Sequence, residues 1–213
     1  MNYELGIDEA GRGPILGPLV MAGVLVPDDK KEVLLDWGVA DSKQFGSGVK
    51  GKQQREKLAQ KIKENFQHEI FVLSSQKVDN YVEKHSLNNL EQETALRIIQ
   101  RLPADTVILD GKNLFKPIVN EKIKAYNKAD QKYLCVSAAS ILAKAERDRL
   151  FDTICLDYIE DFGEIKGGGY ANKKTLEFVQ WFLGKNGTLP PFYRKSFKWK
   201  YLLQIEREYN SDC

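Results

Sequence analysis

The sequence has little cysteine and almost no histidine. Its three cysteines, Cys135, Cys155 and Cys213, are odd in number and stand far apart, so they do not predict a disulfide framework. Two histidines are too few for a histidine-rich metal site, and neither lies near a nucleophile-elbow motif of a serine hydrolase. No basic and apolar leader precedes the first apolar segment. These absences favour a reducing, cytoplasmic setting.

Long apolar runs and a large excess of charge are also absent. The run PLVMAGVLV is followed at once by Pro27 and falls short of the roughly 20 residues that span a bilayer, which argues against a membrane protein. A net charge of +2 is too small to identify a partner by itself. The 213 residues suffice for one substantial domain, and 42% hydrophobic residues are enough for a core without cross-links. The composition is consistent with a monomer.

The order of apolar runs predicts a mixed α/β domain. Residues 3–9 and 19–26 are β-rich and read as a pair of strands joined by a Gly/Pro connection. Further strands are expected at 68–75, 105–111 and 123–130, with helical spacing in the intervening segments. A long helix follows, with Ser137 as its expected N-cap and small residues that allow close packing on a sheet. A glycine-rich turn near 167–169 marks the border of a smaller C-terminal helical lobe.

Carboxylates recur at the ends of the predicted strands. Asp8 and Glu9 end the first strand, Asp110 ends the strand at 105–111, and Asp130 ends the one at 123–130. Strand ends on one edge of a sheet converge, and four converging carboxylates repel one another unless a cation lies between them. Hard oxygen ligands suit Mg²⁺ or Mn²⁺, and a pair of such ions about 4 Å apart can activate water and stabilise a leaving oxygen of a phosphodiester.

Each acid also has a simpler interpretation. Taken singly, Asp110 in DGKN and Asp130 are ordinary turn residues. Adjacent Asp8 and Glu9 at the tip of an apolar strand are harder to explain in this way, because burying two charges without compensation is costly. The following GRGPILG could be a phosphate-binding loop, but it lacks the Lys-Ser/Thr ending of a P-loop and the spacing of a dinucleotide fingerprint.

Five blocks together resemble the type 2 ribonucleases H, specifically ribonuclease HII. They are GIDEAGRGPILGPLVMAGVLV, DSK at 41–43, ILDG, NKADQKYLCVSAASILAKAERDR and GGGYANKKT, in that order. The resemblance covers residues 3 to about 200. It implies an RNase H-like fold, with a mixed central sheet flanked by helices in residues 1–165 and a C-terminal helical substrate-binding extension of the same domain in 166–213.

The resemblance also implies an activity and a set of site residues. The expected reaction is hydrolysis, assisted by two Mg²⁺ or Mn²⁺ ions, of the RNA strand of RNA/DNA hybrids and of the bond 5′ to a single ribonucleotide in duplex DNA. It would leave 5′-phosphate and 3′-hydroxyl ends. The residues that match the family motifs are the metal-binding acids Asp8, Glu9, Asp110 and Asp130, the ribose-reading Gly11, Arg12 and Gly13, the phosphate-binding Lys43, and Tyr170, which packs on the next sugar.

Further basic residues and three alternative functions are also consistent with the sequence. The basic tail residues Arg194, Lys195 and Lys198 are expected to bind phosphates, and Lys128 to lie near the scissile phosphate. A ribonuclease HIII-like enzyme that prefers longer RNA tracts is one alternative, although Arg12 between the two glycines favours HII. A non-catalytic hybrid-binding module and a nucleotide-binding protein are the others. No clear protein-partner motif stands in the sequence.

Overall fold

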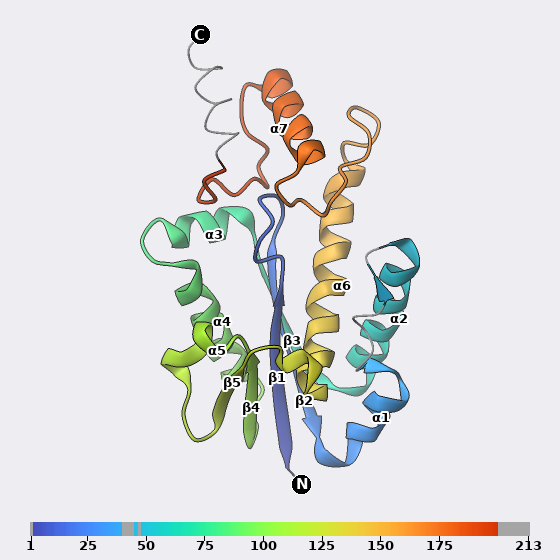
Figure 1. Cartoon of the computed structure of the whole chain (residues 1–213), viewed down its shortest axis with the longest axis vertical. Helices are drawn as coiled ribbons and strands as arrows, with labels where there is room; N and C mark the ends of the chain where they lie inside the picture. The colour runs from blue at the N-terminus through green and yellow to red at the C-terminus, as the bar shows by residue number, and fades with distance from the viewer. Residues whose placement is uncertain (1, 40–44, 47, 200–213) are drawn as a thin grey trace.

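The fold is organised around one mixed sheet (Figure 1). The computed structural model describes residues 2–39, 45–46 and 48–199. Its strands are β1 (Tyr3–Ala10), β2 (Leu19–Pro27), β3 (Gln67–Leu73), β4 (Thr106–Asp110) and β5 (Ile123–Tyr126), in the order β3-β2-β1-β4-β5. Strands β1, β2 and β3 pair antiparallel, whereas β4 lies parallel to β1 and β5 parallel to β4. The predicted opening pair and mixed sheet are confirmed.

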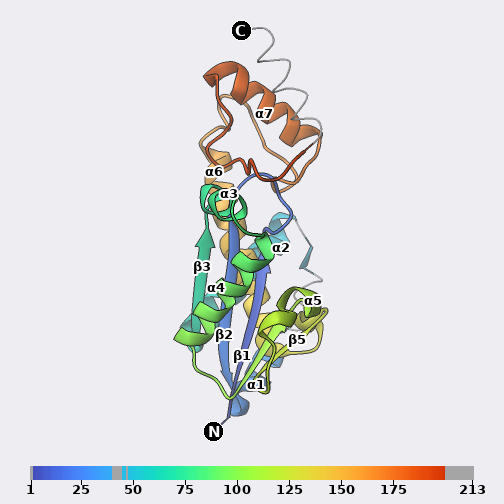
Figure 2. The same ribbon diagram turned by 90° about the vertical axis from the view of Figure 1, so that its left-hand side faces the viewer.

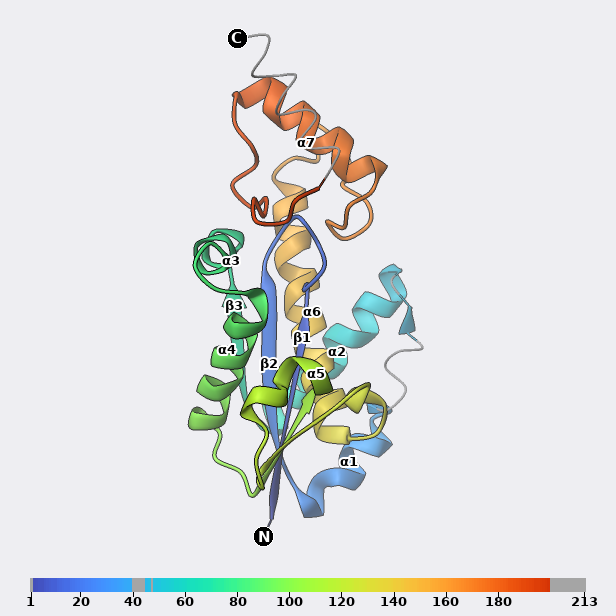
Figure 3. The ribbon, with the colours of Figure 1, turned by 60° about the vertical axis from the view of Figure 1, so that its left-hand side comes forward.

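Helices cover both faces of this sheet (Figure 3). They are α1 (Lys31–Asp36), α2 (Val49–Asn65), α3 (Ser75–Val82), α4 (Leu87–Arg101), α5 (Lys112–Phe115), α6 (Leu134–Leu156) and α7 (Lys173–Asn186). Side chains of α1, α2 and α6 share a core with one face, to which β1 contributes Ala10. Side chains of α4 and α5 share a core with the other face, to which β1 contributes Leu5 and Ile7. The strand therefore presents alternate residues to the two layers, as a regular strand does.

Two glycines allow these helices to lie close to the sheet. A Cβ added at Gly6 in β1 would stand 2.1 Å from the carbonyl carbon of Cys135 in α6. A Cβ at Gly23 in β2 would stand 2.3 Å from Cγ2 of Ile98 in α4. Neither position can accept a side chain without moving a helix, so Gly6 and Gly23 set the spacing of the layers.

The C-terminal lobe packs on the far end of α6 (Figures 1 and 2). Its core joins Phe178 of α7 to Phe151 of α6, to Leu16 in the loop between β1 and β2, and to Ile165 and Tyr193. Leu16 and Tyr193 also form an antiparallel β-bridge. The lobe is therefore attached to the loop that follows Asp8 and Glu9. The division between residues 165 and 166 stays a prediction.

Two expectations about the segment before α6 are wrong. Asp130 does not end β5, because β5 stops at Tyr126 and Asp130 lies in a following 3₁₀ turn, Ala129–Gln131. Ser137 is not the N-cap of α6, because the helix begins at Leu134 with Tyr133 as its N-cap. The hydroxyl of Ser137 instead donates to the backbone carbonyls of Tyr133, at 3.2 Å, and Asp130. It thereby ties the turn that carries Asp130 to the first turn of α6.

Candidate active site

Three of the predicted acids form a cluster. One ligand oxygen each from Asp8, Asp110 and Asp130 lies within 4.8 Å of the other two. The pairing of β1 with β4 ends at Ile7 and Leu109, so Asp8 and Asp110 follow at the same carboxyl edge, which is the usual site of ligand binding in sheets of this kind. The fold therefore creates this cluster from two parallel strands and one turn.

The turn that carries Asp130 is held by Asp110. The backbone N–H of Ala129 donates to Oδ1 of Asp110 at 3.0 Å. Just before it, Lys128 has a φ of 56°, the one non-glycine residue with positive φ in the described chain. A left-handed conformation costs a lysine about 1 kcal/mol or more, and such strain is concentrated at functional sites. Lys128 is exposed and stands two residues before Asp130 in the chain, and its predicted position near the scissile phosphate stays a prediction.

Glu9 lies next to the cluster rather than in it. Successive residues of a strand face opposite sides, and β1 stays regular through Ala10, so Glu9 is turned toward the α4 side while Asp8 is turned toward α6. Its Oε2 atom is buried without a hydrogen-bond partner in the described chain. Burial and the charges of Asp8, Glu91 and Asp110 raise the pKa of Glu9 well above its usual range. Metal ligation by Glu9 stays a prediction.

The cluster has the electrostatics of a cation site. Asp8 is 6% exposed, and burial raises its pKa to about 6, with a smaller contribution from the charge of Asp110. A hydrogen bond from Ser140 and the charge of Lys144, both on α6, act in the opposite direction. A bound divalent ion would remove the repulsion that the protein leaves uncompensated, so the residues present fit Mg²⁺ or Mn²⁺.

A cavity of about 270 Å³ adjoins these acids. It is lined by Glu9, Ala10, Gly11, Arg12, Gly13, Pro14, Lys144, Arg147, Asp148 and Tyr170. The predicted ribose-reading segment and Tyr170 thus meet in space although they are far apart in sequence. A Cβ added at Gly13 would lie 3.1 Å from Cε1 of Tyr170, so only glycine leaves this contact unstrained. Tyr170 as a whole is 54% exposed, so it is accessible to a ligand.

The side chain of Arg12 is bound to α4. Its Nε donates to both carboxylate oxygens of Glu91 at 3.1 Å, and its Nη2 donates to Oδ1 of Asn88 at 2.6 Å. Glu91 is fully buried in α4, so this pair fixes the loop to the helix. Glu91 was missed by sequence reasoning, and only its position in the apolar stripe of α4 could have marked it.

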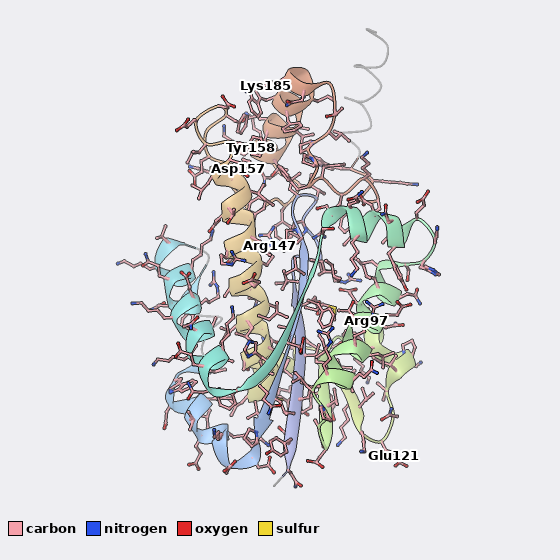
Figure 4. All side chains as sticks on the ribbon, turned by 180° about the vertical axis from the view of Figure 1, so that it is seen from behind. Arg97, Glu121, Arg147, Asp157, Tyr158 and Lys185 are labelled. Atoms are coloured by element: carbon pink, nitrogen blue, oxygen red, sulfur yellow. The ribbon has the colours of Figure 1, made fainter. Side chains whose placement is uncertain are left out.

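The loop of Tyr170 is bonded to the loop of Gly13. The backbone amides of Ile15 and Leu16 donate to the carbonyl of Gly169 at 2.9 and 3.1 Å. Arg147 stands on α6 (Figure 4). It is buried beside Gly11 and Gly17 and donates to the carbonyl of Gly168. Arg147 and Lys144 were also missed, although they stand on α6 within one turn of each other.

The prediction that Arg194 binds phosphate is wrong. Its side chain is fully buried, and its Nε donates to the carbonyl of Gly17 at 3.0 Å. The neighbouring Lys195 and Lys198 are exposed, and their phosphate contacts stay predictions. Lys43 lies outside the described residues.

A second cavity, of about 880 Å³, continues from the first along α6. Both cavities share Lys144, Arg147, Asp148 and Tyr170. Lys52 and Arg55 of α2 line the larger one but are engaged by Asp152, at 2.7 Å, and Asp148, at 3.1 Å. No ion pair of Lys144 is formed within the described ranges. Its half-buried ammonium is therefore a positive charge available at the junction of the two cavities.

Comparison with known proteins identifies the family. A family model described as ribonuclease HII matches residues 5–200. The chain belongs to the ribonuclease HII family. A ribonuclease HII of Methanobrevibacter smithii is 37% identical over 202 residues, covering 91% of this chain and 94% of that protein. A ribonuclease HII of Cenarchaeum symbiosum is 33% identical over 210 residues, with the same coverage of 91% and 94%.

Solved structures of the ribonuclease HII family share the fold. The crystal structure of ribonuclease H2 from Pyrococcus horikoshii has a TM-score of 0.82 and 30% identity, covering 98% of this chain and 99% of that one. The ribonuclease HII of Archaeoglobus fulgidus, solved in complex with PCNA, has a TM-score of 0.77 and 32% identity over 93% and 96% of the chains. The predicted RNase H-like fold is confirmed.

Family membership establishes the class of enzyme. Ribonucleases HII are type 2 ribonucleases H, hydrolases that cut RNA paired with DNA internally, and ribonuclease H activity is assigned to this chain. The aspartate cluster agrees with the divalent-metal dependence of the family. Within the described residues, no helix combines the length and apolar character needed to cross a membrane.

Proposed function

We propose that this chain cuts the RNA strand of RNA/DNA hybrids and also duplex DNA on the 5′ side of a single embedded ribonucleotide. The observation that carries the proposal is that the aspartate cluster and the 270 Å³ cavity adjoin each other. The Asp8, Asp110 and Asp130 cluster adjoins, through Glu9, the cavity that brings Gly11 to Gly13 together with Tyr170. This arrangement supports the proposal, because the acids that would carry out the chemistry adjoin the residues that would read the sugar.

The acids supply the hydrolytic half of the site. Asp8, Asp110 and Asp130, with Glu9 beside them, would hold Mg²⁺ or Mn²⁺, and two such ions would activate water for in-line attack and stabilise the leaving 3′-oxygen. The hydrogen bond from Ala129 to Asp110 and the contact of Ser140 with Asp8 keep the carboxylates in place. The products are a 5′-phosphate and a 3′-hydroxyl.

The cavity supplies the recognition half. The backbone N–H of Gly13 makes no hydrogen bond within the described chain and lies where a ligand can reach it, so it can donate to a ribose 2′-hydroxyl. Tyr170, in contact with Gly13, would pack on the following sugar, where a deoxyribose leaves more room than a ribose. In this arrangement the 2′-hydroxyl is recognised and does not act as the nucleophile.

Basic residues around the cavities would bind the backbone. Lys144 lies at the junction of both cavities, and Lys195 and Lys198 are exposed in the last described segment of the lobe. Contacts of lysine with phosphates release counterions, so duplex binding should weaken as salt rises and should not depend on base sequence.

The decisive experiment is cleavage of labelled duplex DNA that contains one ribonucleotide, with Mg²⁺ and separately with Mn²⁺. The cut is mapped to the nucleotide and compared with that of an all-RNA strand paired with DNA. We expect a metal-dependent cut 5′ of the ribonucleotide. Asp130→Asn should lower the rate by roughly three orders of magnitude, because a lost metal ligand removes several kcal/mol of stabilisation from the transition state.

The matched control is Glu121→Gln, which removes an exposed carboxylate at the opposite end of the sheet (Figure 4). It should cleave at the wild-type rate. Cleavage of the long hybrid alone would assign a ribonuclease HIII-like preference. If Asp130→Asn cleaves as well as Glu121→Gln, the aspartate cluster is not the catalytic centre.

A further inference from the structure

Arg194 is a buried cation without an ion pair. Its side chain has no exposed surface, and no carboxylate lies within salt-bridge distance of it in the described chain. Burial lowers its pKa to about 10 and the nearby charge of Arg147 acts in the same direction, whereas the charges of Asp79 and Glu91 raise it. Burying an unpaired guanidinium is costly, and an apolar side chain could fill the same space at lower cost. An arginine at this position is therefore explained by the hydrogen bonds that its guanidinium donates.

The guanidinium binds two carbonyl groups of the loop between β1 and β2. Its Nε donates to the carbonyl of Gly17 at 3.0 Å, and its Nη1 donates to the carbonyl of Arg12 at 3.3 Å. The backbone of Arg194 is itself fixed, because its N–H donates to the carbonyl of Ile15 at 2.8 Å. The planar fork of an arginine can hold two carbonyls in a defined relation, which a lysine ammonium cannot do as rigidly.

The contact with the Arg12 carbonyl determines where the next amide points. The carbonyl of Arg12 and the N–H of Gly13 belong to one peptide group, and the described chain contains no cis peptide bond. In a trans peptide the C=O and N–H bonds point in opposite directions across a rigid plane. Because Arg194 holds the carbonyl toward the protein interior, the N–H of Gly13 is turned the other way.

Arg12 and Gly13 both line the 270 Å³ cavity, whereas Arg194 is buried outside its lining. The cavity is therefore the side on which a ligand can reach the N–H of Gly13. The amide of Gly13 has no acceptor within the described part of the chain, although Tyr170 packs beside its Cα. Glycine at 13 has no side chain to restrain its peptide, and it therefore depends on such an external contact.

We propose that Arg194 is a positioning residue for ribose recognition, acting through the Arg12 carbonyl to aim the Gly13 amide at the 2′-hydroxyl of the bound strand. The inference rests on the proposed function. Through Arg194, the C-terminal lobe contributes to the discrimination between ribose and deoxyribose, although Arg194 does not contact the nucleic acid.

The test compares Arg194→Lys with Ser75→Ala. The Ser75 hydroxyl donates to the carbonyl of Gly17 at 3.0 Å and to that of Phe192 at 2.7 Å, so it supports the same loop without contacting Arg12. Dissociation constants are measured in EDTA, where no cleavage occurs, for an all-DNA duplex and for the same duplex with one ribonucleotide. The dissociation constant for the all-DNA duplex divided by that for the ribonucleotide duplex reports recognition of the 2′-hydroxyl. The constant for the all-DNA duplex alone reports general affinity.

We expect Arg194→Lys to reduce this ratio by about fivefold to tenfold, the effect of one hydrogen bond, with unchanged affinity for all-DNA duplex. Ser75→Ala should keep the wild-type ratio even if its melting temperature falls. A wild-type ratio in Arg194→Lys, or an equal loss in both variants, would overturn the assignment. A ratio of one in the wild-type protein would instead refute the proposed recognition itself.

A measurement on the unmodified protein covers the case in which Arg194→Lys does not fold. In an ¹⁵N-labelled wild-type sample, the amide resonance of Gly13 should shift when the ribonucleotide duplex is added and should stay in place with the all-DNA duplex. An equal response to both duplexes would mean that the Gly13 amide does not face the 2′-hydroxyl, and would overturn the role of Arg194.

Discussion

At the scale of single residues, Asp8 and Glu9 show how alternation along a strand separates two neighbouring acids. The regular pairing of β1 directs Asp8 toward α6 and Glu9 toward α4, so one acid enters the cluster and the other lines the adjoining cavity. Both are held in surroundings that disfavour their charge. The protein without metal therefore carries electrostatic strain at this edge of the sheet.

This strain predicts a stabilising substitution. The folded-state pKa of Asp8 is raised from 3.8 to about 6, so the native state binds more protons than the unfolded state between these values, and the contribution of Asp8 to stability falls as pH rises through this window. In EDTA, the stability advantage of Asp8→Asn over wild type should grow by about 2 to 3 kcal/mol from pH 4 to pH 7. Urea unfolding at several pH values measures it.

Two controls define the outcome. Asp29→Asn removes an exposed carboxylate and should show a difference from wild type that does not vary with pH. Added Mg²⁺ should stabilise wild type at pH 7 and should have a smaller effect on Asp8→Asn. A pH-independent advantage of Asp8→Asn would show that Asp8 is not destabilised by its surroundings.

At the scale of elements, α6 connects the sheet, the acids and the lobe. Its first turns pack on Gly6 of β1, its middle carries Ser140 and Lys144 beside Asp8, and its last turns place Phe151 in the core of the lobe. An error in the spacing between α6 and β1 would therefore be transmitted to the acid cluster.

The glycine at position 6 provides the test of this spacing. Gly6→Ala should destabilise the protein by about 3 kcal/mol or more, because the added methyl group would overlap backbone atoms of α6 that cannot move freely. Thermal unfolding followed by circular dichroism measures the change.

The control is Gly184→Ala in α7. That position is exposed, and an added Cβ would have no neighbour within 4 Å. Alanine is favoured over glycine within a helix by about 1 kcal/mol, so this variant should be slightly stabilised. If both variants behave alike, close packing at Gly6 does not limit stability.

At the scale of the whole molecule, the lobe is joined to the loop between β1 and β2 and to α6 by hydrogen bonds and by a common apolar core. The loop of Gly11 to Gly17 is bonded to Gly169, Phe192 and Arg194, and the lobe core includes side chains from that loop and from α6. The 270 Å³ cavity is thus lined by both parts of the chain, and neither part alone contains it.

Such sharing predicts a single cooperative unfolding transition. Trp37 packs against the main core, whereas Trp181 packs in the lobe. In a Trp37→Phe variant, fluorescence then follows the lobe, and its urea midpoint should coincide with the midpoint given by circular dichroism. In Trp181→Phe the two midpoints should coincide as well. A lobe transition at lower urea would make residues 166–213 a separate domain.

The sequence by itself determined the five strands, the longer helices, the family and the three aspartates that cluster, because apolar periodicity and contiguous motifs are local properties of the chain. It did not place Asp130 beyond the end of β5, nor show that Glu9 faces away from Asp8, because turn geometry and strand register depend on pairing with distant residues. The sequence also predicted, wrongly, that Arg194 binds phosphate, because a sequence does not show whether an arginine is buried. Only the tertiary structure decided that it is buried against the carbonyls of Arg12 and Gly17, since burial depends on what the rest of the chain packs around a residue.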